Sequence, residues 1–198
     1  MSHIDAIQRG FSLVAWLATE VDGLSLDGSL RNRLSAACLS VTQDHHAAII
    51  VLLEQKLYAS AFTLARPQYE SYVRGLWLAN CATDVEVERF ASGDEPPGIT
   101  VLLASLQKVE AFEDGMLSKI KQDSWRDMCE YTHTGALQAK RWLTEAGIEQ
   151  NYPAEEIEML ANFAGSIALL SSIGTAMIAQ NEQLANRLLE RSREHAEA

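Results

Sequence analysis

The apolar residues of this chain recur every three or four positions along most of its length, which is the spacing of one face of an α-helix. No stretch alternates apolar and polar residues for long enough to predict a β-sheet. The chain has 198 residues but only four prolines and eleven glycines, so few positions interrupt a helix. Its length suits one domain with one core. The pattern therefore predicts an all-α, single-domain helical bundle that spans residues 1–198 and has about six to eight helices.

Short loops rich in Asp, Gly or Pro separate the predicted helices. The helices are expected from Ile4 to Val21, Ser29 to Tyr58, Ser60 to Cys81, Thr83 to Phe90, Val101 to Phe112, Gly115 to Tyr131, Ala136 to Ala146 and Ala154 to Arg193. The second is long and carries two apolar stripes, which predicts a central position in the bundle. The last, also long, has one bulky stripe and one ridge of small residues, which would let another helix backbone approach closely.

The charge balance bears on the possible partners. Asp and Glu number 27 against 16 Lys and Arg, so the formal net charge is −11. So acidic a surface repels phosphate backbones and anionic lipid, and we expect no DNA partner and no membrane association. The segment Met159–Ala179 has no charged residue and is long enough to cross a bilayer. Polar residues interrupt it and acidic residues flank it, so we expect a buried helix there.

The N-terminus and the cysteines indicate the compartment. No basic segment followed by an apolar run begins the chain, so no secretory signal is predicted. The three cysteines are widely separated and form no Cys-x-x-Cys pair, which predicts reduced thiols and a cytoplasmic protein. His45 and His46 project about 100° apart on a helix, and the chain has only one Glu-x-x-His pair on its helices, Glu130–His133. We therefore expect no metal and no cofactor.

Charged side chains occur at regular spacing on one of the apolar helices. Arg66, Glu70 and Arg74 are four residues apart, so Glu70 can reach both arginines. Burying such a triplet costs desolvation energy, and stability alone rarely explains it. If residues 29–58 and 60–81 form a tight hairpin that turns near Tyr58, then Asp44 lies opposite Arg74 in a shared polar pocket. A purely structural network of paired side chains is the competing interpretation.

A second pattern concerns ribonuclease chemistry. Arg126 and His133 resemble the Arg-x(4–6)-His motif of the HEPN superfamily, helical proteins that often act as metal-independent RNases on a dimer. The resemblance implies that His133 assists proton transfer at the ribose 2′-hydroxyl and that Arg126 stabilises charge at the phosphate.

A third pattern combines three separated segments. Residues 66–77 read Arg-Pro-x-x-Glu-x-x-x-Arg-x-x-Trp, residues 131–135 read Tyr-Thr-His-Thr-Gly, and residues 44–46 read Asp-His-His. Together they resemble a family of uncharacterised bacterial helical proteins, a domain-of-unknown-function family, over roughly Thr42 to Lys140. The resemblance implies an all-helical fold with a distant HEPN relation and implies that Arg66, Glu70, Arg74 and His133 lie together.

These patterns leave three functional hypotheses open. The first is a protein, dimeric or bound to a partner protein, whose polar pocket binds a small anion or that partner. The pocket would comprise Asp44, His45, His46, Arg66, Glu70, Arg74, Trp77 and Tyr131. The second is a HEPN-like RNase of a toxin or defence system, with Arg126 and His133 as catalytic residues and RNA as its partner. The third is a structural interaction module without a catalytic site.

Overall fold

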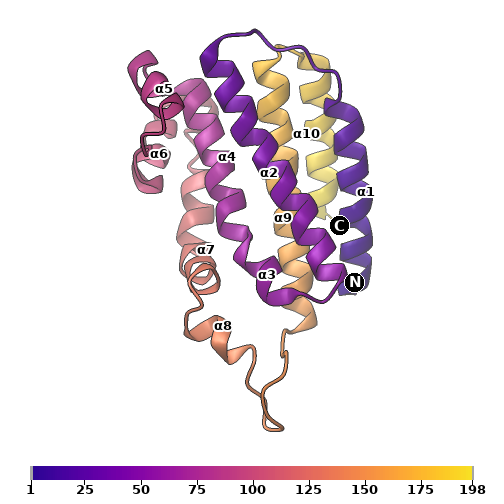
Figure 1. The fold of residues 1–198 in the computed structure, drawn as a ribbon. Helices are drawn as coiled ribbons and strands as arrows, with labels where there is room; N and C mark the ends of the chain where they lie inside the picture. The colour runs from indigo at the N-terminus through magenta and orange to yellow at the C-terminus, as the bar shows by residue number, and fades with distance from the viewer. Residues whose placement is uncertain (1, 198) are drawn as a thin grey trace.

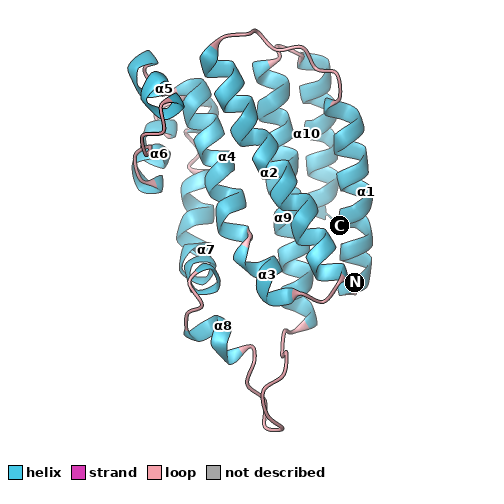
Figure 2. Cartoon of the chain, in the orientation of Figure 1, coloured by secondary structure: helices cyan, strands magenta, loops and turns pink. Residues whose placement is uncertain are grey.

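The computed structural model describes residues 2–197, which form ten α-helices and one 3-10 turn (Figure 1). The helices are α1 (His3–Val21), α2 (Leu30–Glu54), α3 (Tyr58–Thr63), α4 (Ala65–Asn80), α5 (Asp84–Ala91), α6 (Ile99–Leu106), α7 (Met116–Thr132), α8 (Ala136–Lys140), α9 (Ala154–Ile178) and α10 (Glu182–Glu197). Within these residues no strand forms, and the only β-type contact is the isolated bridge Leu143–Ile148 (Figure 2). The predicted all-α class is confirmed.

The core is organised around the two longest helices. Helix α2 packs against α1, α4 and α9, and α9 also contacts α1 and α10. Leu39, Ile49 and Ile50 of α2 and Leu169 of α9 are fully buried. Helices α4 and α7 lie on the other side of α2 from α1 and α10, with α5 and α6 at the edge of the bundle (Figure 1). The contacts of α2 with three long helices agree with the central position that its two apolar stripes predict.

The small-residue ridge of α9 is buried, as the sequence indicates, and brings other elements close. Ser171 Oγ donates a hydrogen bond of 2.9 Å to the backbone oxygen of Leu39. A Cβ atom at Gly165 would lie 2.8 Å from the ring of His195, so that side chain of α10 packs directly on the backbone of α9 there. Helices α2 and α9 are both long and apolar enough to cross a membrane. Buried core helices have the same length and composition, so this is weak evidence for a membrane span.

Two predicted helices are each divided in the structure and a third ends early, in each case at a position that is not glycine. The long C-terminal helix expected from Ala154 to Arg193 breaks after α9, and Gln180 there has a left-handed backbone with φ 54°. The helix expected to reach Tyr58 ends at Glu54, followed by Lys56 with φ 57°. The helix expected from Ser60 to Cys81 is divided at Leu64 into α3 and α4.

Two further boundaries differ from the prediction. The helix expected from Ala136 to Ala146 ends at Lys140, and the following residues form a loop that projects from one end of the bundle (Figure 1). The helix expected from Val101 to Phe112 ends at Leu106, and Glu110–Phe112 forms the 3-10 turn. Val109 before this turn has an extended backbone, with φ −91° and ψ 129°, so the 3-10 turn is a separate element and not a continuation of α6.

The α2–α4 pair has a different register from the one expected. Because the turn lies at residues 55–57, Thr42 Oγ1 lies 2.9 Å from Ser71 Oγ, and Ser35 Oγ donates a 2.6 Å hydrogen bond to the oxygen of Gly75. In this register Arg74 lies near Cys38 of α2 and not near Asp44. The predicted pairing of Asp44 with Arg74 is therefore wrong.

Candidate functional site

Arg66 is the centre of the polar cluster. Its Nε donates a 2.8 Å hydrogen bond to Oε1 of Glu70, one turn further along α4. Its Nη1 lies 2.7 Å from Nε2 of His133, and its Cζ lies 4.7 Å from the centre of the Trp125 ring. A guanidinium has donors only, so Nε2 of His133 is the acceptor in this hydrogen bond. One arginine thus joins a carboxylate, an imidazole and an indole.

The junction between α3 and α4 is held against the end of α7. Thr63 Oγ1 donates to the backbone oxygen of Tyr131 at 3.2 Å, and Thr132 Oγ1 donates to the oxygen of Thr63 at 3.4 Å. His133 is the C-cap of α7, so these hydrogen bonds bring its ring to the first turn of α4. Pro67 fits this first turn because the backbone N–H groups there have no partner within the helix.

An open hollow lies beside this cluster, between α4, α7 and the start of α6. Arg66, Glu70, Arg74 and Trp125 line one side, and the segment 95–102 lines the other; we call this space of about 560 Å³ the Arg74 hollow. Within residues 2–197, Nε of Arg74 is buried and has no hydrogen-bond partner. The N-terminus of α6 also lines the hollow, and its first N–H groups carry partial positive charge. The hollow therefore holds several groups that attract an anion.

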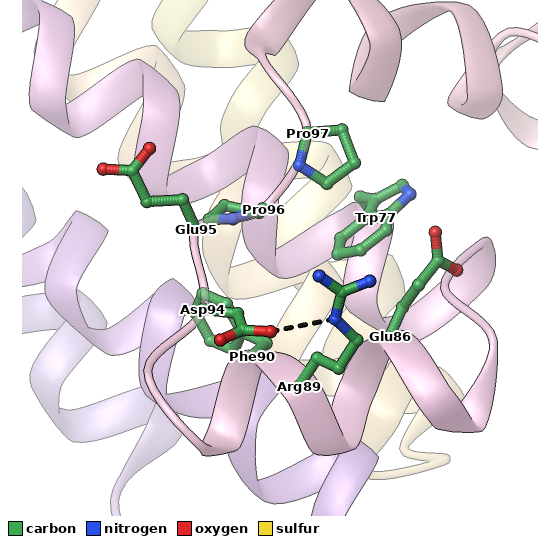
Figure 3. A pocket seen from close by; sticks show the side chains of 8 residues that line it. All are labelled: Trp77, Glu86, Arg89, Phe90, Asp94, Glu95, Pro96 and Pro97. Carbon is green, nitrogen blue, oxygen red and sulfur yellow. Dashed lines mark hydrogen bonds and ion pairs between the residues drawn. The ribbon is translucent and has the colours of Figure 1, made fainter.

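Trp77, predicted to belong to the same pocket, lies on the far side of the Glu95–Pro97 segment. Its side chain is 3% exposed and faces a smaller cavity of about 250 Å³ (Figure 3). There Arg89 Nε donates to Asp94 at 2.8 Å, so the arginine of this cavity is already engaged by a carboxylate. The Glu95–Pro97 segment lines both spaces and separates Trp77 from Arg66.

The predicted Asp-His-His segment does not join the site. His46 is 1% exposed, and burial, together with a smaller effect of His195 on α10, lowers its pKa to about 4. His46 thus faces the interior near α10. Asp44 is exposed, and within residues 2–197 it makes no hydrogen bond or ion pair. Burial lowers the pKa of the half-buried His45, and Asp44 opposes that change.

Tyr131 also lies elsewhere, in a cleft on the other side of α7. Its hydroxyl donates to Oε2 of Glu156 at 3.4 Å, and its ring lies 4.6 Å from that of Phe62. Arg141 forms an ion pair with the same Glu156. Burial raises the pKa of Tyr131. Tyr131 is therefore a structural contact of α7 with α9 and not a part of the Arg74 hollow.

The proposed catalytic arginine does not reach the histidine. Arg126 is exposed on α7 and makes no hydrogen bond or ion pair to any of residues 2–197, whereas His133 contacts Arg66. No group of three or more metal-ligating side chains occurs within the described residues. The structure thus assembles Arg66, Glu70 and His133, with Arg74 nearby, and leaves out Asp44, His45, His46, Trp77, Tyr131 and Arg126.

Two residues of the site were missed from the sequence. Trp125 provides the flat surface under Arg66, and Nζ of Lys121 lies 5.7 Å from the centre of the same ring. Their spacing of four residues on α7 was the available signal, because it places both on one helix face. Nothing in the local sequence indicated that this face turns toward α4.

The fold and the site define an all-α bundle protein with an arginine-centred polar cluster at its surface. The chain belongs to a family of unknown function, DUF6988, whose profile matches residues 39–198. The match includes every residue of the cluster and excludes α1. Neither the curated proteins nor the solved structures yield a significant match to this chain.

Proposed function

We propose that this protein binds a small organic monoanion in the Arg74 hollow. The observation that carries the proposal concerns Arg74, which lines the hollow. Its Nε is buried and has no hydrogen-bond partner among the described residues. Arg66 is already engaged by Glu70 and His133, so Arg74 is the cation that remains for a ligand. Guanidinium groups bind carboxylates through paired, charge-assisted hydrogen bonds.

The charges of the hollow favour one negative charge over several. Two arginines face two carboxylates, those of Glu70 and Glu95, and the N-terminus of α6 adds partial positive charge. A polyphosphate would meet both carboxylates, whereas a single carboxylate is matched by Arg74 and the helix end. Trp125 and the prolines at 96 and 97 supply flat apolar surface for a planar ligand body.

The proposal is tested with benzoate and its neutral isostere benzamide, titrated by calorimetry. We expect benzoate to bind, benzamide to bind more weakly, and Arg74→Gln to weaken benzoate by about tenfold, or ~1.4 kcal/mol, with little effect on benzamide. Arg33→Gln, which removes an exposed arginine of α2, is the matched control. Equal benzoate affinity in Arg74→Gln and wild type would show that Arg74 does not bind the anion.

The contact between His133 and Arg66 favours a second candidate, RNA cleavage. An exposed imidazole beside a guanidinium combines a proton-transfer group with a cation for phosphate. In this hypothesis Arg66, not Arg126, assists His133. We expect RNA cleavage to be lost in His133→Ala and Arg66→Ala and kept in Arg126→Ala. Absence of cleavage by the wild-type protein would eliminate this candidate.

A further inference from the structure

A second cleft lies on the face of α7 that looks toward α9. Helix α7 packs mainly on α3, α4 and α8 rather than on α9, so the space between α7 and the first half of α9 is not closed. The space measures about 310 Å³, and we call it the α7–α9 cleft. A volume of that size equals that of about ten water molecules, each of which takes about 30 Å³ in the liquid, so it has room for a small organic molecule. Trp125 and Arg66 do not line it, so it is separate from the site proposed above.

The floor of the cleft is apolar and aromatic. Phe62, Met128, Tyr131 and Leu160 line it and are each no more than 6% exposed in the folded chain. Phe163 continues the wall on α9. Aromatic faces of this kind attract an organic cation as well as a hydrocarbon, because the ring face carries partial negative charge.

The polar groups of the cleft divide into paired and unpaired ones. Glu156 is neutralised by its ion pair with Arg141 and accepts the hydroxyl hydrogen bond of Tyr131. Asp123 and Asp127 line the mouth, and in residues 2–197 neither carboxylate has a hydrogen bond or an ion pair. They are four residues apart on α7, so their like charges repel each other when the cleft is empty.

We propose that the α7–α9 cleft binds an amphiphilic organic cation, an ammonium group attached to an aromatic or hydrocarbon body. The body occupies the floor between Phe62 and Leu160, where it buries apolar surface. The ammonium lies at the mouth between Asp123 and Asp127, where it relieves their repulsion. The walls thus match both halves of such a ligand, whereas an anion would meet two uncompensated carboxylates.

The test uses 2-phenylethylammonium and, as the neutral molecule of the same shape, 2-phenylethanol, each titrated into the full chain by calorimetry. We expect the ammonium to bind at least about tenfold more tightly than the alcohol. The double variant Asp123→Asn/Asp127→Asn should lose about that factor for the ammonium and bind the alcohol as the wild type does. Glu190→Gln/Glu197→Gln, which removes the same charge from α10, should change neither affinity.

Three outcomes would overturn the proposal. The first is equal affinity of the wild type for the ammonium and the alcohol, because the carboxylates would then contribute nothing. The second is the same loss in the α7 and α10 double variants, because net charge alone would then explain it. The third is the absence of measurable binding of either molecule. Competition with benzoate distinguishes this cleft from the Arg74 hollow, since ligands of separate sites do not displace each other.

Discussion

At the residue scale, His46 is a neutral histidine enclosed in the core of an acidic protein. Its side chain is 1% exposed, and Nε2 has no hydrogen-bond partner within the described chain. Burial disfavours the charged ring and lowers the pKa to about 4, and nearby His195 acts in the same direction. In the unfolded chain the same ring takes up a proton near its ordinary pKa of about 6.5. His46 therefore links folding to pH.

We predict that the free energy of unfolding falls as the pH is lowered from about 6.5 to about 4, because only the unfolded state then binds a proton at His46. The full effect is on the order of 3 kcal/mol, at about 1.4 kcal/mol per pH unit of pKa difference. Urea unfolding across this range measures it. The dependence should be reduced in His46→Gln and kept in His3→Gln at the start of α1. Parallel curves for His46→Gln and wild type would contradict the assignment.

At the element scale, three helices end in the same six-residue arrangement, with a residue other than glycine at the left-handed position. After α9, Asn181 N–H donates to the oxygen of Ala176 and Gln180 N–H donates to that of Met177. After α2, Leu57 and Lys56 donate to Leu52 and Leu53 in the same way. The end of α7 has the matching bond from Gly135 to Glu130, with Thr134 at φ 52°. This is the Schellman motif, whose left-handed position usually holds glycine.

We predict that Gln180→Gly stabilises the protein by about 0.5–1 kcal/mol, because glycine adopts the left-handed conformation without a Cβ penalty. Thermal or urea unfolding measures the change. Glu190→Gly, in the middle of α10, is the control and should destabilise by about 1 kcal/mol. Destabilisation by Gln180→Gly would mean that the glutamine side chain contributes more than the backbone strain costs.

At the scale of the whole molecule, the first helix is part of the core although the family match begins inside α2. Ile7, Leu13 and Leu17 of α1 are each no more than 4% exposed and pack with buried residues of α2, α9 and α10. Each such side chain contributes about 2 kcal/mol by burial, so together they match a large share of a typical net stability. The fold of this chain therefore depends on residues outside the segment matched to the family.

We predict that removing residues 1–28 abolishes cooperative unfolding, because the apolar faces of α9 and α10 that cover α1 become exposed to water. Circular dichroism during heating measures this loss. The point variant Leu13→Ala should still unfold cooperatively, with a loss of about 2–5 kcal/mol. A shortened chain that melts sharply near the wild-type temperature would show that α1 is dispensable.

The polar site was partly predictable from the sequence. Contacts within one helix could be predicted, whereas contacts between helices could not. Arg66 and Glu70 are one turn apart on a helix, so spacing alone predicts their ion pair. Their association with His133 rested on the motif resemblance, and the contact is present. Trp125 was missed, and Asp44 was placed opposite Arg74, because both depend on how one helix is rotated and shifted against another.

The amino-acid sequence by itself determined the helical class, the central position of α2 and the buried small-residue face of α9, because each is a periodic pattern within one segment. Only the tertiary structure decided where helices α2 and α9 end, which register α2 and α4 adopt and which arginine meets His133. Those outcomes depend on packing between segments distant in sequence. A shift of a few residues in the turn between two helices changes every facing pair, and no local pattern records that shift.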